Sequence, residues 1–217
     1  MLTTIKKISS LSLAIGLSIA SSILIPQMVR AEGSGSGLDQ TILKDISISN
    51  FEQVNDTILR GAAPSDENLR LLAKSGVKTI VDLRMAGPAV KHESGVAHEL
   101  GINYVHVPLG FKSPNLSEMT RVLGVLNNSE KQPVFVHCRQ GADRTGMTIG
   151  MYRRIHDKWE FDKTYAEMRK HHFKPVLRGM KSAVKKCPHS PTLQSAFVPA
   201  EKTLTASQSS LSHTKNN

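Results

Sequence analysis

The sequence predicts an α/β fold with a central, mostly parallel sheet of about four to five strands flanked by helices. Short β-branched segments alternate with longer segments of helical periodicity, and the connections between them are short. A strand–helix–strand order with short connections favours parallel strands that are covered by helices on both faces. We therefore expect a three-layer sandwich.

The expected strands are short and rich in β-branched residues. Segments 46–51 and 57–60 flank the turn-forming pair Asn55-Asp56, so we expect them to pair antiparallel. Three further segments are expected to be core strands: 77–83, 102–107 and 133–137.

The expected helices are delimited by capping and breaking residues. Ser65 is the expected N-cap of a helix that Gly76 ends, and Gly101 closes a second helix over residues 89–100. Pro114 opens a third helix. Three more helices are expected at 145–159, 162–171 and 176–186.

Both ends of the chain differ in composition from this α/β region. Residues 1–31 combine two lysines, an apolar run and small residues up to Ala31, which is the three-part build of a signal peptide. An uncleaved membrane anchor is the alternative. A Gly/Ser-rich flexible leader follows over 32–45, and the polar tail 188–217 is expected to be disordered. We expect a folded domain over 46–187, in a protein that is periplasmic or secreted after cleavage near Ala31.

The chain is basic. Residues 1–31 contain three basic residues and no acidic residue. Removing them therefore lowers the formal net charge from +10 to +7. A basic surface favours phosphorylated proteins, anionic small molecules or lipid headgroups as partners. Lys181, Lys185 and Lys186 form either a solvated helix face or a contact with a membrane. The basic residues are not clustered with aromatic ones, which argues against a nucleic-acid-binding module.

Two cysteines are present, Cys138 and Cys187, and two thiols in an exported protein can form a disulfide. The surroundings of Cys138 instead favour a reactive thiol. No CxxC or HExxH pattern occurs, so we expect no metal. The pair His171-His172 does not change this expectation, because adjacent residues on a helix do not share a face.

The segment that carries chemistry is 134–146, in which a strand leads into Cys138, five residues follow, and Arg144 precedes a helix. Such a loop can direct successive N–H groups at one centre, and the helix N-terminus adds partial positive charge. Gly141 permits the backbone angles that this curl needs, and the Arg144 guanidinium can hold two phosphoryl oxygens at once. The expected phosphate-binding residues are Arg139, Gln140, Gly141, Ala142, Asp143 and Arg144.

The same loop predicts a nucleophile. Converging N–H dipoles and Arg144 stabilise a thiolate, so Cys138 should ionise well below the usual thiol pKa of about 8.5. A thiolate can attack phosphorus and form a phosphocysteine intermediate that water hydrolyses. The Thr145 hydroxyl is expected to donate to the departing sulfur. His137 is expected to support the loop through hydrogen bonds, because a thiolate that is already formed needs no base.

The pattern HCxxGxxRTG over residues 137–146 resembles the signature of the protein tyrosine and dual-specificity phosphatase superfamily. Residues 59–64 and 76–84 are similar to the compact bacterial dual-specificity-like members. The resemblance covers roughly residues 46–186. It implies a central sheet flanked by helices, hydrolysis of phosphomonoesters and no cofactor, with Cys138 as nucleophile, Arg144 as phosphate clamp and Thr145 as the hydroxyl partner.

The resemblance does not identify the residue that acts as general acid. Many members place an aspartic acid upstream of the signature, but no Asp occurs between Leu83 and His137. Asp143 is similar in position to a loop aspartate of myotubularin and Sac-type phosphoinositide phosphatases, and it is the candidate acid. Alternatively, Asp143 orients Arg144 or caps the following helix, and Glu118 is the next candidate.

Three functions remain open from the sequence. The first is a phosphatase for phosphotyrosine, or for phosphoserine and phosphothreonine as well. The second is a phosphatase for phosphoinositides, inositol phosphates or phosphorylated envelope lipids and glycans. The third is an inactive phosphate-binding module. Arg139 and the basic charge favour anionic substrates, whereas Asp143 weighs against a strongly basic pocket.

Overall fold

A computed structural model describes residues 37–197, which all belong to one unit of the chain. Its centre is a five-stranded sheet in the order β1-β2-β5-β3-β4. β1 pairs antiparallel with β2, and the other four strands are parallel to one another, so the predicted mostly parallel sheet is confirmed. The strands are β1 (Glu52–Asn55), β2 (Ile58–Ala62), β3 (Thr79–Asp82), β4 (Asn103–His106) and β5 (Val134–Cys138).

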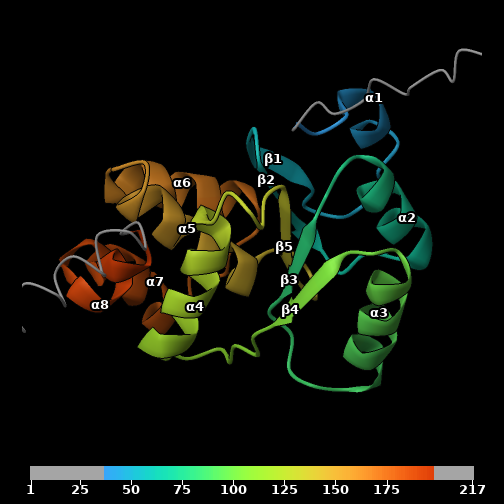
Figure 1. The fold of residues 1–217 in the computed structure, drawn as a ribbon. Coiled ribbons are helices and arrows are strands. Elements are labelled where there is room, and N and C mark those ends of the chain that lie inside the picture. The colour runs from blue at the N-terminus through green and yellow to red at the C-terminus, as the bar shows by residue number, and fades with distance from the viewer. Residues whose placement is uncertain (1–36, 198–217) are drawn as a thin grey trace, which may run out of the picture. The chain divides into compact units, whose positions relative to one another are not determined.

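Helices cover both faces of the sheet (Figure 1). One face carries α1 (Gln40–Leu43), α2 (Asp66–Lys74) and α3 (Pro88–Glu99). The other face carries α4 (Leu116–Asn127), α5 (Asp143–Ile155), α6 (Phe161–Lys170), α7 (Arg178–Lys186) and α8 (Pro191–Gln194), with short 3-10 turns at Cys187–His189 and Ser195–Phe197. Ser65 caps α2 by accepting a hydrogen bond from the Asn68 amide, as the sequence predicts.

The sheet divides the apolar core into two clusters. Alternate residues of one strand point to opposite faces, so Val134 and Val136 pack with α4 and α5, whereas Phe135 packs with α2 and α3. These three side chains of β5 are fully buried. Because β5 is the middle strand and is buried on both faces, its end is a rigid place from which to present a loop.

The expected first strand is wrong. Residues 52–55 form β1, and 46–51 do not form a strand. Asn50 has a φ of 56°, which is incompatible with extended backbone, and Ile46 is buried with α1 and α2. The antiparallel pairing with β2 is nevertheless present, in a strand that begins six residues closer to the turn than predicted.

The expected termini also need correction. The leader prediction over 32–45 is wrong from residue 38, because Asp39 caps α1 and Leu43 is buried. The tail prediction is wrong for 188–197, where Ser190 caps α8 and Leu193 is buried against the core. The predicted signal peptide lies outside the described residues. Within residues 37–197, no helix has the length and apolar character needed to cross a membrane.

Candidate active site

The candidate site is the loop between β5 and α5, at the carboxyl edge of the parallel strands. Cys138 is the last residue of β5, and α5 begins at Asp143. The ends of the flanking strands lie beside it, with Ala62 of β2 next to Cys138 and Asp82 of β3 next to His137. Ligands of open α/β sheets bind at this edge, so the topology places the predicted loop where a substrate site belongs.

Four successive carbonyls of this loop accept hydrogen bonds from groups outside it. The pairs are Cys138 O with His137 Nδ1 (3.4 Å), Arg139 O with Ala63 N (3.4 Å), Gln140 O with Asn50 Nδ2 (2.8 Å) and Gly141 O with Arg60 Nη2 (2.9 Å). The peptide bonds are trans, so each N–H points away from the carbonyl of its own peptide unit. The N–H groups of residues 139–142 therefore face away from these donors, as an anion cradle requires.

Gly141 is required by conformation and by space. Its φ is 68°, in the left-handed region. A Cβ at this position would lie 2.4 Å from the Gly61 carbonyl carbon and 2.6 Å from the Ala62 nitrogen. The loop thus packs directly on the main chain of β2, and only glycine allows this approach.

Cys138 and Arg144 line one cavity of about 310 Å³. Both residues are buried, at 2% and 6% exposure. Arg144 Nη1 donates to Leu83 O at 3.2 Å, and the guanidinium lies 4.8 Å from the centre of the Phe111 ring. This contact orients Arg144 while most of its five N–H donors stay available for phosphoryl oxygens. The cavity is lined by Phe111, Cys138, Arg139, Gln140, Asp143, Arg144 and Lys174.

Asp143 lines the same cavity and also holds a neighbouring loop. Its Oδ1 accepts a hydrogen bond from the Lys174 amide at 2.9 Å, and its Oδ2 lies 3.8 Å from Lys174 Nζ. Asp143 therefore fixes the segment between α6 and α7 against the first turn of α5. Thr145 is fully buried, and within residues 37–197 its hydroxyl makes no hydrogen bond, including the expected one to the Cys138 sulfur.

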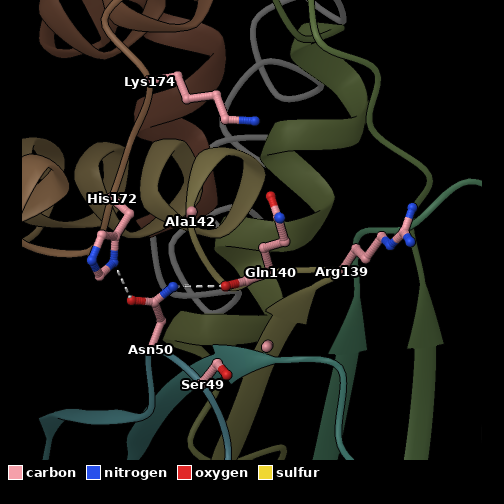
Figure 2. Close-up of a pocket in the computed structure, with 8 residues that line it drawn as sticks. Ser49, Asn50, Arg139, Gln140, Ala142, His172 and Lys174 are labelled. Atoms are coloured by element: carbon pink, nitrogen blue, oxygen red, sulfur yellow. Dashed lines mark hydrogen bonds between the residues drawn. The ribbon is translucent and has the colours of Figure 1, made fainter.

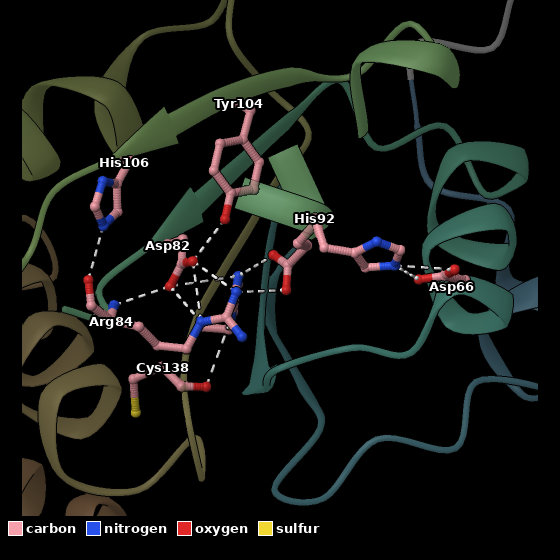
Figure 3. A network of polar contacts seen from close by, with 9 residues as sticks. Asp66, Asp82, Arg84, His92, Tyr104, His106 and Cys138 are labelled. Carbon is pink, nitrogen blue, oxygen red and sulfur yellow. Dashed lines mark hydrogen bonds and ion pairs between the residues drawn. The ribbon is translucent and has the colours of Figure 1, made fainter. Parts of the chain in front are cut away.

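A buried polar network supports the loop from the side of β3 (Figure 3). His137 Nε2 lies 2.8 Å from Glu93 Oε1, and Arg84 binds both Glu93 and Asp82 at 2.7 Å. Tyr104 adds a hydrogen bond from its hydroxyl to Asp82 Oδ2 at 2.5 Å. Through Glu93, the network holds the imidazole that contacts the Cys138 carbonyl.

Arg84 is shared by the two carboxylates of this network. Burial alone raises the pKa of Asp82, but the hydrogen bonds from Arg84 and the charge of His137 outweigh it, so the net pKa is lowered. Asp82, Glu93 and His137 also place three potential ligand atoms within 4.8 Å of one another. Because Arg84 already pairs with both carboxylates and His137 lies against Glu93, we assign the cluster to loop support rather than to a metal. Asp66 takes no part in the network and lies 2.9 Å from His92.

A second cavity, of about 360 Å³, lies beside the first (Figure 2). Asn50 lines this cavity. Its Nδ2 donates to Gln140 O, and its Oδ1 lies 2.9 Å from His172 Nδ1. Arg139, Gln140 and Lys174 line both cavities, so the two are neighbours across the loop. The second cavity is lined by three basic and no acidic side chains among Ser49, Asn50, Ala62, Arg139, Gln140, Ala142, His172 and Lys174.

Sequence reasoning missed several residues that build the site. Arg60, Asn50 and Glu93 support the loop, and Lys174 lines both cavities. Arg60 had a signal, because a charged residue stands inside the apolar run of β2. The other three come from segments far along the chain, and their positions depend on tertiary packing. His171, the first residue of the adjacent histidine pair, is 5% exposed and pairs with Glu52.

The second cysteine is expected to have no part in redox protection. Cys187 is 2% exposed, its sulfur contacts Val184 O at 3.2 Å, and burial raises the pKa of its thiol to about 12. Both cysteines are free thiols in this structure. We expect Cys187→Ser to lose activity under peroxide at the wild-type rate and to regain it with dithiothreitol. A variant that is inactivated irreversibly would instead show that Cys187 forms a protective disulfide with Cys138.

Comparison with protein families gives one match over most of the described region. The family model described as DSP-PTPase phosphatase fused to NAD+ Kinase matches residues 41–186. The matched residues include the loop, Arg60, Glu93 and the segment that carries Lys174.

Relatives and solved structures agree with this match. The chain is 27% identical over 123 residues to the dual specificity protein phosphatase TpbA of Pseudomonas aeruginosa, covering 56% of this chain and 54% of TpbA. It is 27% identical over 129 residues to the inositol diphosphatase DSP2 of rice, covering 54% and 59%. The chain thus spans little more than half the length of these relatives. The catalytic core of SIW14 from Saccharomyces cerevisiae has the same fold, with a TM-score of 0.62, 23% identity and coverage of 71% of this chain and 97% of that one.

Proposed function

The chain belongs to the family of dual-specificity-type phosphatase domains described as DSP-PTPase phosphatase fused to NAD+ Kinase, and we propose on this basis that it is a cysteine-dependent phosphomonoester hydrolase. The observation that carries the proposal is the loop itself. Cys138 and Arg144 line one cavity. Four carbonyls of the loop accept hydrogen bonds from outside it, so the N–H groups of residues 139–142 point away from those hydrogen-bond donors. A nucleophile, a bidentate cation and a dipole cradle are the groups that phosphoryl transfer needs.

In the first proposed step, the Cys138 thiolate attacks phosphorus. The S–P bond forms as the bond between phosphorus and the leaving oxygen breaks, and that oxygen takes a proton from a general acid. Arg144 and the N–H groups of the loop hold the three equatorial oxygens. In the second step, water attacks phosphorus and gives a proton to the now ionised general acid, the S–P bond breaks, and orthophosphate and the thiolate are released. Thr145, which lies in the first turn of α5, would stabilise the departing sulfur.

Asp143 is proposed as the general acid. It lines the cavity with Cys138, and a phosphate dianion in the loop would favour its protonated form through like-charge repulsion. We expect Asp143→Asn to slow phenyl phosphate, which has a poor leaving group, far more than p-nitrophenyl phosphate, because only the former needs a proton from an acid. The high-pH fall of the rate profile should disappear as well.

The contacts of Asp143 with Lys174 provide the competing structural explanation, and a matched variant separates the two. Lys174→Met removes the side-chain cation near Asp143 Oδ2 but leaves the backbone hydrogen bond to Oδ1 in place. If Asp143→Asn slows both substrates equally and the profile keeps its shape, Asp143 only positions the loop. Glu118, which lies in the first turn of α4, is then the next residue to test.

Phosphorylated protein is the first proposed substrate, on tyrosine or on serine and threonine as well. The similarity to TpbA, which is named a dual specificity protein phosphatase, supports it. A phosphorylated small molecule or lipid headgroup with several phosphates is the second proposal. It is supported by the basic cavity beside the loop, lined by Arg139, His172 and Lys174, and by the similarity to proteins named inositol diphosphatases.

A substrate panel tests these proposals with the full chain. Phosphotyrosyl and phosphoseryl peptides, inositol phosphates and phosphoinositides are compared by kcat/KM for orthophosphate release. Faster turnover of the multiply phosphorylated compounds, lost in Lys174→Met, would favour the second proposal. Binding of orthophosphate without turnover of any compound would show an inactive phosphate-binding module.

We also propose that the chain is exported and cleaved after Ala31. The support is the composition of residues 1–31, which lie outside the described residues. Expression in a secreting bacterium and sequencing of the recovered N-terminus test the proposal. A start at Glu32 is expected, and a start at Met1 would contradict cleavage.

A further inference from the structure

Arg60 is a buried cation that the proposed mechanism does not use. It lies on β2, is 1% exposed and is the largest fully buried side chain among the described residues. Its Nη2 donates to Gly141 O at 2.9 Å, whereas Nε and Nη1 have no hydrogen-bond partner within residues 37–197. Burial lowers the pKa of Arg60 to about 10, so the side chain still carries its charge at neutral pH. An arginine in this environment costs stability, which calls for a function.

The charge of Arg60 is not cancelled by a nearby carboxylate. No acidic group of the described residues lies within 4.0 Å of it. Glu167 and Glu52, the nearest acidic influences on Arg60, are paired with other cations, namely Arg153 for Glu167 and Lys170 and His171 for Glu52. Arg60 is therefore a buried cation without a paired carboxylate among the described residues, and its guanidinium contacts the loop at Gly141 O.

That loop contains the nucleophile. Arg60 Nη2 also lies 3.9 Å from where a Cβ of Gly146 would stand, so the guanidinium sits beneath the start of α5 as well as beneath the loop. A buried positive charge at this place would favour a thiolate over a thiol. The hydrogen bond to Gly141 acts in the same direction. Holding this carbonyl toward β2 turns the Ala142 N–H to the opposite side of the trans peptide.

We propose that Arg60 is a positioning residue, whose buried guanidinium sets the peptide of Gly141 and supplies the positive charge beneath the loop that favours the Cys138 thiolate. This role differs from that of Arg144, which lines the cavity itself. The catalytic part of this inference rests on the proposed phosphatase function. Its test uses alkylation of Cys138 without substrate, so it can succeed or fail independently of phosphatase activity.

The test measures the rate of Cys138 carboxymethylation by iodoacetamide against pH, in the full chain with Cys187→Ser as background. The other charged groups around the cavity are unchanged in every variant: Arg139, Asp143, Arg144, Lys174 and His137. We expect Arg60→Met to raise the pH midpoint of alkylation by about one unit, and to weaken the binding of orthophosphate. Arg60→Lys should keep the midpoint close to that of the wild type, because it keeps the charge.

Arg154→Met is the matched control. The Arg154 side chain is also mostly buried, at 12% exposure, and donates to a backbone carbonyl, but its contacts are with Trp159 O and Glu160 and not with the loop. We expect it to lose stability without moving the midpoint. A purely structural role of Arg60 would give the same result for both arginines.

The outcomes decide the proposal even if one variant does not fold. A folded Arg60→Met variant that alkylates with the wild-type midpoint would overturn it. If Arg60→Met does not give a cooperative melt, Arg60→Gln replaces it, since glutamine keeps hydrogen-bond donors at this buried position but carries no charge. A higher midpoint in Arg60→Gln than in Arg60→Lys is then expected, and equal midpoints would refute the electrostatic role.

Discussion

Replacing Cys138 by serine is expected to lower the turnover of any phosphomonoester by about 10⁴-fold or more, while orthophosphate binding stays nearly intact. The serine hydroxyl is close in size to the thiol but does not ionise near neutral pH, so no nucleophile forms. The cradle and Arg144 remain in place, because none of the four carbonyl contacts uses the Cys138 sulfur. Steady-state kinetics and calorimetric titration with orthophosphate measure the two effects separately.

Arg144→Lys provides the contrast to this result. A lysine cannot reproduce the planar fork of the guanidinium, so we expect weaker binding and about a 10²- to 10³-fold loss of rate together. Cys138→Ser should thus separate binding from turnover, and Arg144→Lys should not. Substantial activity in Cys138→Ser would show that the reaction does not proceed through this residue.

Gly141→Ala is the second change with a large expected effect. The new Cβ would meet the Gly61 and Ala62 main chain at 2.4–2.6 Å, and the φ of 68° disfavours any residue with a Cβ. The neighbouring atoms are backbone of β2 and cannot rotate away. We expect a loss of at least about 2 kcal/mol in the free energy of unfolding, and about a 10²-fold or greater loss of kcat/KM because the cradle is displaced. Denaturant unfolding and kinetics measure both.

Gly124→Ala is the control for this change. Gly124 lies inside α4, and a Cβ there would have nothing within 4 Å. We expect unchanged activity and a gain of up to about 1 kcal/mol, since alanine is the better helix former. If both glycine variants behaved alike, the close packing of the loop on β2 would be refuted.

The loop could be predicted from the sequence because its elements are local. A buried strand, a cysteine, a glycine, an arginine and a helix start follow one another within residues 134–146, and each leaves a signal in the chain. The alternation of strands and helices gave the mostly parallel sheet for the same reason. The strand boundaries were less well predicted, as residues 46–51 show, because the left-handed Asn50 is set by its contacts with Gln140 and His172.

The groups that support the loop could not be predicted in this way. Arg60 and Asn50 precede their hydrogen-bond partners by 81 and 90 residues, and only the pairing of β2 with β5 brings them together. Glu93 lies on α3 and is 3% exposed, because the helix packs it toward Arg84 and His137. Chemistry that resides in one segment is readable from sequence, whereas its support comes from distant segments and requires the fold.

The most direct test of the proposed mechanism is to trap the covalent intermediate. The full chain is mixed with p-nitrophenyl phosphate, quenched in acid within the first turnover, digested and examined by mass spectrometry. The account predicts the mass of one phosphoryl group on the peptide that contains Cys138, absent in Cys138→Ser and absent after the reaction has run to completion. Hydrolysis of the substrate at the wild-type rate with the phosphoryl group on another residue, or on none, would contradict it.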